Sequence, residues 1–311
     1  MEDFLKTIRT GINVCSITPF NREGDLDEGA LRAHYSRMAT AGVGVFLPII
    51  GTGESQLMRI DEIRRIWKIG VEELKGKVPV YVGGIGLNET RYMIDLANEA
   101  GATGADGVYL YGPRPLPAGR ELPPAWIESY FREVLDRVKW PVLIADNTFI
   151  VGYSLPVEIV KAMVEGYDQV AGIIASDTDP TYIPRLLDAV GPDMPVVEVT
   201  PLPNLVKNLS RGAAGALSIE ANVAPNLCAA VYSAFASGDI SGAEAALSKV
   251  TRLYEVFSQY TNPTGVKAAV NLLGFAGGYA RSPYHPPSEA ALAEIAAVLD
   301  ELEIRKVEGA A

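Results

Sequence analysis

The 311-residue sequence predicts a single (β/α)8 barrel, a TIM barrel, followed by a C-terminal helical extension. Eight short apolar runs alternate with amphipathic ones, and no Pro/Gly/Ser-rich linker divides the series. Each run is continuously apolar, as expected of parallel strands buried on both faces. A doubly wound open sheet would normally use fewer strands and a phosphate-type first turn. The predicted strands are residues 12–17, 43–49, 78–84, 105–111, 141–146, 170–175, 194–199 and 213–219.

Helix start and stop signals separate these strands. Asp27 and Glu28 open the first predicted helix, and a later one has Pro156 in its first turn and Gly166 at its end. After Asn222 the pattern is helical only. We therefore assign residues 1–237 to the barrel and residues 238–311 to the helical extension. In such a barrel the functional site lies in the loops at the carboxyl ends of the strands.

Composition limits the partners of the chain. Its 27 Lys and Arg against 38 Asp and Glu give a formal net charge of 27 − 38 = −11 and a pI near 4.8. This negative field repels phosphate backbones and anionic lipid, so we expect neither nucleic acid nor a membrane surface as a partner. No run approaches the ~18 apolar residues of a membrane span, and no signal-type segment opens the chain. We expect a cytoplasmic protein.

The residues most often used for metals and redox chemistry are sparse. Cys15 and Cys228 stand far apart in apolar stretches and are interpreted as core residues. His34 and His285 lie off the predicted strand ends, so a structural or solvated role is expected. No His/Cys set has zinc spacing, and GGIG at 83–86 lacks the full dinucleotide-binding pattern. We predict neither a metal nor a cofactor.

Polar residues at the predicted strand ends are the candidates for chemistry. In GTGES (51–55), Gly51 lets the backbone approach a ligand and Thr52 can donate to a carboxylate; the alternative is a simple capped turn. Several acids also gather at strand ends and could bind a hard cation. No two are held together by helical spacing, so we interpret them as solvated loop acids: Glu54, Asp146, Asp177, Glu198 and Glu220.

Glu198 differs from the others because it lies inside the apolar strand MPVVEV. An ionised acid is expensive to bury without a partner, so an inward Glu198 should have a raised pKa and suit acid–base chemistry. The alternative is an outward Glu198 paired with a helix Lys or Arg.

Six fragments, taken together and in order, resemble the dihydrodipicolinate synthase / N-acetylneuraminate lyase family over nearly the whole chain. They are ITPFNREGDLD (17–27), GTGES (51–55), GIGLNET (84–90), SRGAAGALSIEAN (210–222), VKAAVNLLG (266–274) and RSPYHPPSE (281–289). The resemblance implies a class I aldolase or dehydratase and a homo-oligomer. It also implies a strand-six lysine that forms a Schiff base with pyruvate or a related 2-oxo acid, a strand-five tyrosine that relays protons, and a strand-two turn that holds the carboxylate.

The sequence departs from this pattern where the imine chemistry belongs. The lysine of the family's strand-six motif falls on Ile174, the strand-five tyrosine on Ala145 and the arginine that follows it on Ile150. The aromatic stretch after strand four becomes Pro113-Arg114-Pro115, and the first threonine of the turn falls on Gly51. The lysines that might substitute lie outside the predicted barrel strands: Lys161, Lys207 and Lys267.

Three functional hypotheses follow. The first is a lyase-family enzyme that acts on a small oxo- or hydroxy-acid without an imine, and the second is a non-catalytic paralogue that binds such an acid. The third is an ordinary aldolase that uses another lysine. In the first, Glu198 is the acid–base group, facing inward because the family's strand-seven pocket glycine aligns with Thr200. The predicted ligand-binding residues are Gly51, Thr52, Arg114, Ala145, Asn147, Ile174, Ser176, Thr200 and Leu217.

Overall fold

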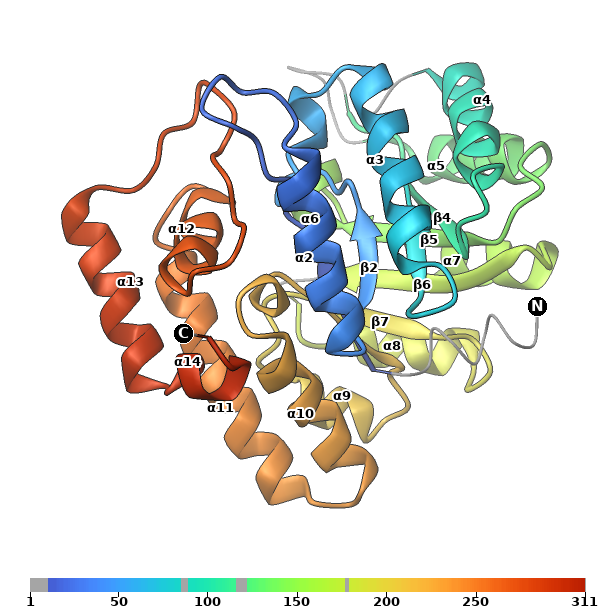
Figure 1. The fold of residues 1–311 in the computed structure, drawn as a ribbon. Helices are drawn as coiled ribbons and strands as arrows, with labels where there is room; N and C mark the ends of the chain where they lie inside the picture. The colour runs from blue at the N-terminus through green and yellow to red at the C-terminus, as the bar shows by residue number, and fades with distance from the viewer. Residues whose placement is uncertain (1–10, 85–88, 116–121, 177–178, 311) are drawn as a thin grey trace.

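The computed structural model describes residues 11–84, 89–115, 122–176 and 179–310. Its eight strands form a closed parallel barrel in sequence order, with the last strand pairing with the first (Figure 1). The (β/α)8 prediction is confirmed. The strands are β1 (Gly11–Cys15), β2 (Gly44–Leu47), β3 (Val80–Val82), β4 (Gly107–Tyr111), β5 (Val142–Asn147), β6 (Val170–Ser176), β7 (Val196–Val199) and β8 (Gly215–Ser218).

Helices follow the strands and surround the barrel. Capping residues set their starts: the Asp27 carboxylate accepts a hydrogen bond from the Ala30 amide at the start of the first helix. The barrel helices are α2 (Glu28–Thr40), α3 (Ile60–Leu74), α4 (Thr90–Gly101), α5 (Pro124–Leu135), α7 (Val157–Gly166), α8 (Tyr182–Val190), α9 (Leu205–Leu209) and α10 (Pro225–Ala236). Shorter turns are η1 (Ser55–Leu57), α6 (Thr148–Val151) and η2 (Glu220–Asn222).

The C-terminal segment is helical, as predicted. It contains α11 (Ile240–Phe257), α12 (Thr264–Leu272), α13 (Glu289–Glu301) and α14 (Ile304–Glu308). Helix α11 packs against α10 and α13, and these helices lie together at one side of the barrel (Figure 1). The last two of these, α13 and α14, are separate helices. They separate at Glu303, whose φ of 55° is left-handed and cannot continue an α-helix.

Alternation along the strands divides the buried side chains into two layers. One layer packs between the barrel and its helices and includes Val14, Ile144 and Val196. The other fills the barrel interior, so the barrel is a packed core rather than a pore. The interior layer contains Cys15, Phe46, Tyr81, Tyr109, Tyr111, Leu143, Ala145, Ile174, Val197, Val199 and Leu217.

Membrane spanning can be tested on the described helices. None of them is both long enough and apolar enough to cross a bilayer.

Candidate functional site

A cavity of about 980 Å³ lies at the carboxyl ends of the barrel strands. Predicted ligand-binding residues from four strand ends line it: Gly51, Thr52, Arg114, Asn147 and Thr200. The C-terminal segment contributes Tyr254 from α11 and Asn262 from the loop after it. Sequence reasoning missed this contribution, because it searched only the strand ends.

The strand-two turn has a backbone that glycine makes possible. Gly51 has a left-handed φ of 84°, and a Cβ on Gly53 would lie 2.5 Å from the Ile49 amide nitrogen. The Gly51 amide donates to the Gln56 side chain at 3.0 Å, so it is already used within the turn. Thr52 Oγ1 accepts a hydrogen bond from the Asn262 amide at 3.0 Å. Within the described residues nothing accepts the Thr52 hydroxyl proton, so Thr52 can donate it to a ligand.

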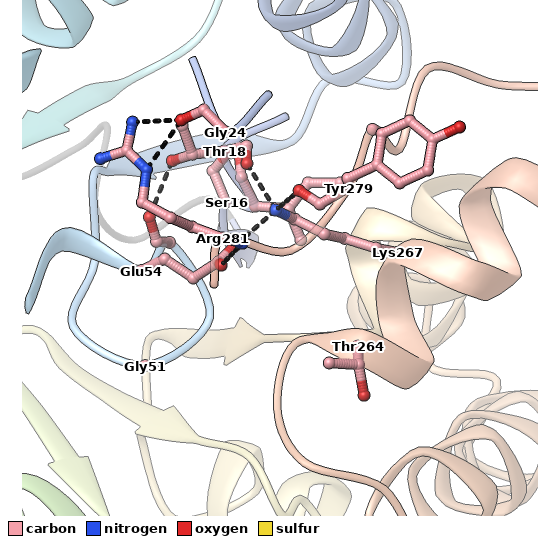
Figure 2. Close-up of polar contacts among 12 residues, drawn as sticks. Ser16, Thr18, Gly24, Gly51, Glu54, Thr264, Lys267, Tyr279 and Arg281 are labelled. Atoms are coloured by element: carbon pink, nitrogen blue, oxygen red, sulfur yellow. Dashed lines mark hydrogen bonds and ion pairs between the residues drawn. The ribbon is translucent and has the colours of Figure 1, made fainter. Parts of the chain in front are cut away.

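A buried ion pair ties this turn to the C-terminal segment. The Lys267 ammonium contacts Glu54 Oε2 and donates to the carbonyl oxygens of Thr18 and Tyr279, each at 2.7 Å (Figure 2). Glu54 Oε1 accepts from the Arg281 amide at 2.8 Å. Glu54 itself is left-handed, with a φ of 56°. The turn therefore keeps its shape because groups from α12 and the following loop hold Glu54.

The same cluster explains why distant fragments of the sequence belong together. Arg281 donates to the Gly24 carbonyl and to the Glu62 carboxylate, and its guanidinium lies 4.2 Å from the centre of the Phe20 ring. The Lys267 ammonium lies 4.7 Å from the centre of that ring. This cluster therefore brings four of the six family-like fragments into contact next to the turn: 17–27, 51–55, 266–274 and 281–289.

The ion pair makes a stability prediction. Lys267→Met should leave the Glu54 carboxylate buried without its counter-charge and lower the free energy of unfolding by about 3 kcal/mol or more. Chemical denaturation measures this loss, and Glu54→Gln in the Lys267→Met background should recover part of it.

Lys161→Met is the matched control, because Lys161 forms only an exposed pair with Glu165 at 3.7 Å. Its effect should stay below about 0.5 kcal/mol. Equal losses from both variants would show that Lys267 contributes no more than a surface lysine.

Two donors come from the ends of strands four and five. Arg114 is exposed at the cavity and has no carboxylate partner among the described residues. Asn147 Oδ1 accepts from the Phe149 amide at 3.1 Å, which leaves the Asn147 amide nitrogen for a ligand. Together with Thr52 they make this sector of the cavity a hydrogen-bond donor surface.

Other predicted ligand-binding residues lie deeper. Ala145, Ile174 and Leu217 belong to the buried interior layer and do not line the cavity. Ser176 is also buried, and its hydroxyl donates to the Asp146 carbonyl at 3.4 Å. Ile174, on which the sequence resemblance places the family lysine, therefore belongs to the interior layer and does not line the cavity.

The predicted orientation of Glu198 is wrong. Its carboxylate accepts from the Asn208 amide of α9 at 2.8 Å, on the helix side of the barrel wall. Its neighbours Val197 and Val199 occupy the interior layer, so alternation directs Glu198 outward. The prediction counted inward from Thr200, which lies beyond the last residue of β7, where strand alternation no longer applies. Burial raises the Glu198 pKa to about 7, but on the face away from the cavity.

This orientation makes a pH-dependent prediction. Because the folded pKa exceeds the unfolded value, ionisation of Glu198 lowers stability as pH rises from about 4.5 to about 7. Glu198→Gln should therefore raise the melting temperature by a few degrees above pH 7 and by much less at pH 4.5. Scanning calorimetry at both pH values measures the difference.

Ligand affinity should be unchanged in Glu198→Gln, and the exposed Glu244→Gln should show neither effect. A large loss of affinity in Glu198→Gln would place the carboxyl in the cavity after all.

The strand-end acids are not solvated, which corrects the sequence interpretation. Four of these acids are buried: Glu54, Asp146, Glu198 and Glu220. The fifth, Asp177, lies outside the described residues. Residues 85–88 of the Gly-rich turn also lie outside them. The four buried carboxyl groups have nearby hydrogen-bond partners. Asp146, for example, accepts from the Leu155 amide at 3.2 Å. No group of three or more potential metal ligands occurs in the described part of the chain.

Glu220 forms a hydroxyl network behind the cavity wall. Its Oε2 accepts from Thr200 Oγ1 at 2.9 Å and from Ser218 Oγ at 2.6 Å, while Oε1 is buried without a partner in the described structure. Burial raises the pKa of the Glu220 carboxyl. Thr200 lines the cavity, so it connects this buried acid to the site.

The cysteines and histidines agree with the sequence interpretation. Cys15 and Cys228 are buried free thiols, and burial lowers the pKa of the His34 imidazole to about 3. His285 is exposed in the loop before α13.

A closed parallel barrel with a cavity at the carboxyl ends of its strands, lined by both polar and apolar side chains, defines a TIM-barrel protein with a site for a small ligand. The sequence profile of the dihydrodipicolinate synthetase family matches residues 9–302. The chain belongs to this family.

Curated relatives and solved structures agree with this assignment. The chain is 31% identical to the 4-hydroxy-tetrahydrodipicolinate synthase of Methanopyrus kandleri, with 89% of each chain covered. It is 30% identical to the enzyme of the same name from Acidiphilium cryptum, with 93% and 97% covered. Among solved structures, a prophage protein of the dihydrodipicolinic acid synthase family from E. coli K12, in complex with pyruvate, has a TM-score of 0.86, 25% identity, and coverage of 95% and 99%.

Proposed function

We propose that this chain binds a small organic acid in the cavity at the carboxyl ends of its strands and handles it without forming an imine. One observation carries the proposal: Ile174 occupies the interior position of β6 where the family resemblance expects the Schiff-base lysine. An isoleucine side chain has no nitrogen with which to attack a carbonyl.

The candidate replacement lysines support this view. Lys161 and Lys207 are exposed on α7 and α9, outside the barrel. Lys267 is buried, but its ammonium already has three acceptors. Burial lowers its pKa to about 8, so at neutral pH it is mostly charged and lacks the free electron pair that an imine requires. None of the described lysines lines the cavity.

The donor sector supports binding of a carboxylate. Arg114 brings a guanidinium that can hold a carboxylate in a bidentate fork, and Thr52 brings an uncommitted hydroxyl proton. The pyruvate-bound E. coli relative shows that a barrel of this fold accommodates such an acid.

Two outcomes for the bound acid remain distinct. The relatives named as synthases favour a lyase, and Thr200, which donates to the buried Glu220, is a group at the cavity that could accept a proton from the ligand. The outward orientation of the Glu198 side chain favours the second outcome, a non-catalytic paralogue. The acid–base group assigned from the sequence is then absent from the cavity. NMR of each bound acid over hours separates these outcomes, since only a lyase converts its ligand.

Two further parts of the proposal come from the sequence. The family resemblance suggests a homo-oligomer, and the composition and N-terminal sequence suggest a cytoplasmic location.

The imine-free proposal predicts that pyruvate with borohydride leaves no covalent adduct on the protein. Intact-mass spectrometry measures this directly, and Ile174→Lys is the positive control because it returns an amine to β6. Stoichiometric trapping on the unmodified chain would contradict the proposal, and peptide mapping would then identify the reacting lysine.

The carboxylate proposal predicts a loss of affinity in Arg114→Ala. A thermal-shift screen of small oxo- and hydroxy-acids first identifies a ligand, because a ligand that binds the native state raises its stability. Arg114→Ala should then weaken that ligand by at least about tenfold, roughly 1.4 kcal/mol.

Arg211→Ala is the matched control, since Arg211 is an exposed arginine in the loop before β8 and away from the cavity lining. An unchanged dissociation constant in Arg114→Ala would return Arg114 to the role of a surface loop residue.

A further inference from the structure

We infer that the cavity selects a hydroxy acid over the matching 2-oxo acid, because Thr200 can offer a ligand only a hydrogen-bond acceptor. This inference rests on the proposed function, that a small organic acid binds in this cavity. It adds the chemical class of that acid.

The hydrogen bonds of Thr200 leave it no proton to give. Its Oγ1 lies 2.9 Å from Glu220 Oε2 and 3.4 Å from the Leu217 carbonyl oxygen, both of which accept, and it accepts from the Ile219 amide at 3.2 Å. A hydroxyl has one proton and two lone pairs. The proton and one lone pair are therefore used inside the protein, and one lone pair remains for a group in the cavity.

The rest of the network fixes the direction of these bonds. Ser218 Oγ accepts from the Ala221 amide at 3.1 Å and lies 2.6 Å from Glu220 Oε2, so it too donates to that oxygen. Glu220 Oε2 can accept from both hydroxyls when the carboxyl is ionised. It can also do so when the carboxyl carries its proton on Oε1. With the carboxyl ionised, or with its proton on Oε1, the Thr200 proton therefore stays inside the wall.

No positive charge overrides this arrangement. Burial and the nearby Glu220 raise the pKa values of Cys15 from β1, Cys228 from α10 and Tyr254 from α11, so these three neighbours are neutral at pH 7. Among the described residues no Lys, Arg or His forms an ion pair with Glu220.

The opposite sector of the cavity has the opposite polarity. Thr52 Oγ1 accepts from Asn262, so its proton is available, and Arg114 supplies only donors. A ligand that fits both sectors carries a carboxylate toward the ends of β2 and β4 and a donor toward Thr200, at the end of β7. A hydroxyl is such a donor. A keto oxygen would instead set its lone pairs against that of Thr200 and leave it unpaired.

Matched ligand pairs test the inference. Calorimetric titration with pyruvate against L- and D-lactate, and with 2-oxobutyrate against the 2-hydroxybutyrates, gives a ratio of dissociation constants for each pair. In the unmodified protein at least one hydroxy acid should bind about tenfold or more tightly than its oxo partner.

Variants then assign the preference to Thr200. Thr200→Val removes the acceptor and should bring the ratio to within about twofold of one, while Thr200→Ser keeps the hydroxyl and the preference. Thr200→Ala serves in place of the valine variant if that variant does not fold. Thr40→Val, which removes an exposed hydroxyl on α2 far from the cavity, should leave the ratio unchanged.

The outcomes separate this inference from the proposal beneath it. Oxo acids that bind as well as hydroxy acids, or a preference that survives Thr200→Val, would each overturn the inference while the acid site stands. If no acid of any kind binds, the proposed function fails, and the inference fails with it.

Discussion

A buried ion pair between Lys267 and Glu54 connects the C-terminal helices to the turn that carries Thr52. Both side chains are almost fully buried, with 3% and 0% of their area exposed. Such a pair is stable only when the remaining hydrogen-bonding capacity of both ions is filled. Here two backbone carbonyls complete the lysine and the Arg281 amide completes the glutamate. The turn, with its left-handed Glu54, thus depends on residues more than 200 positions away.

The interior layer of the barrel is mainly apolar and aromatic. Ile174 and Ala145 contribute only apolar surface to that layer. Hydrogen-bonding chemistry is left to the ring of strand ends above it, with donors at Thr52 and Arg114 and an acceptor at Thr200. The proposed function therefore relies on the strand ends for binding, on a fold that is that of the family.

The fold was predictable because buried parallel strands produce continuous apolar runs, and all eight runs became strands. Several cavity residues were predictable too, since polar groups at strand ends meet at one edge of a barrel. Glu198 was not, because alternation holds only within a strand and Thr200 lies beyond it. The burial of Glu220 was also hidden, since the hydroxyls that stabilise it, Ser218 and Thr200, come partly from another strand. The hydrogen bond between Asn262 and Thr52 joins residues 210 positions apart, and no local sequence pattern predicts such a contact.

A crystal structure of the protein with pyruvate, and a second with the lactate that binds more tightly, tests the central claim most directly. The claim predicts a non-covalent acid in both, with its carboxylate at the Thr52 and Arg114 side of the cavity. The lactate hydroxyl should lie within hydrogen-bond distance of Thr200 Oγ1. Electron density that joins the pyruvate C2 atom to a lysine Nζ, or an acid bound outside this cavity, would contradict it.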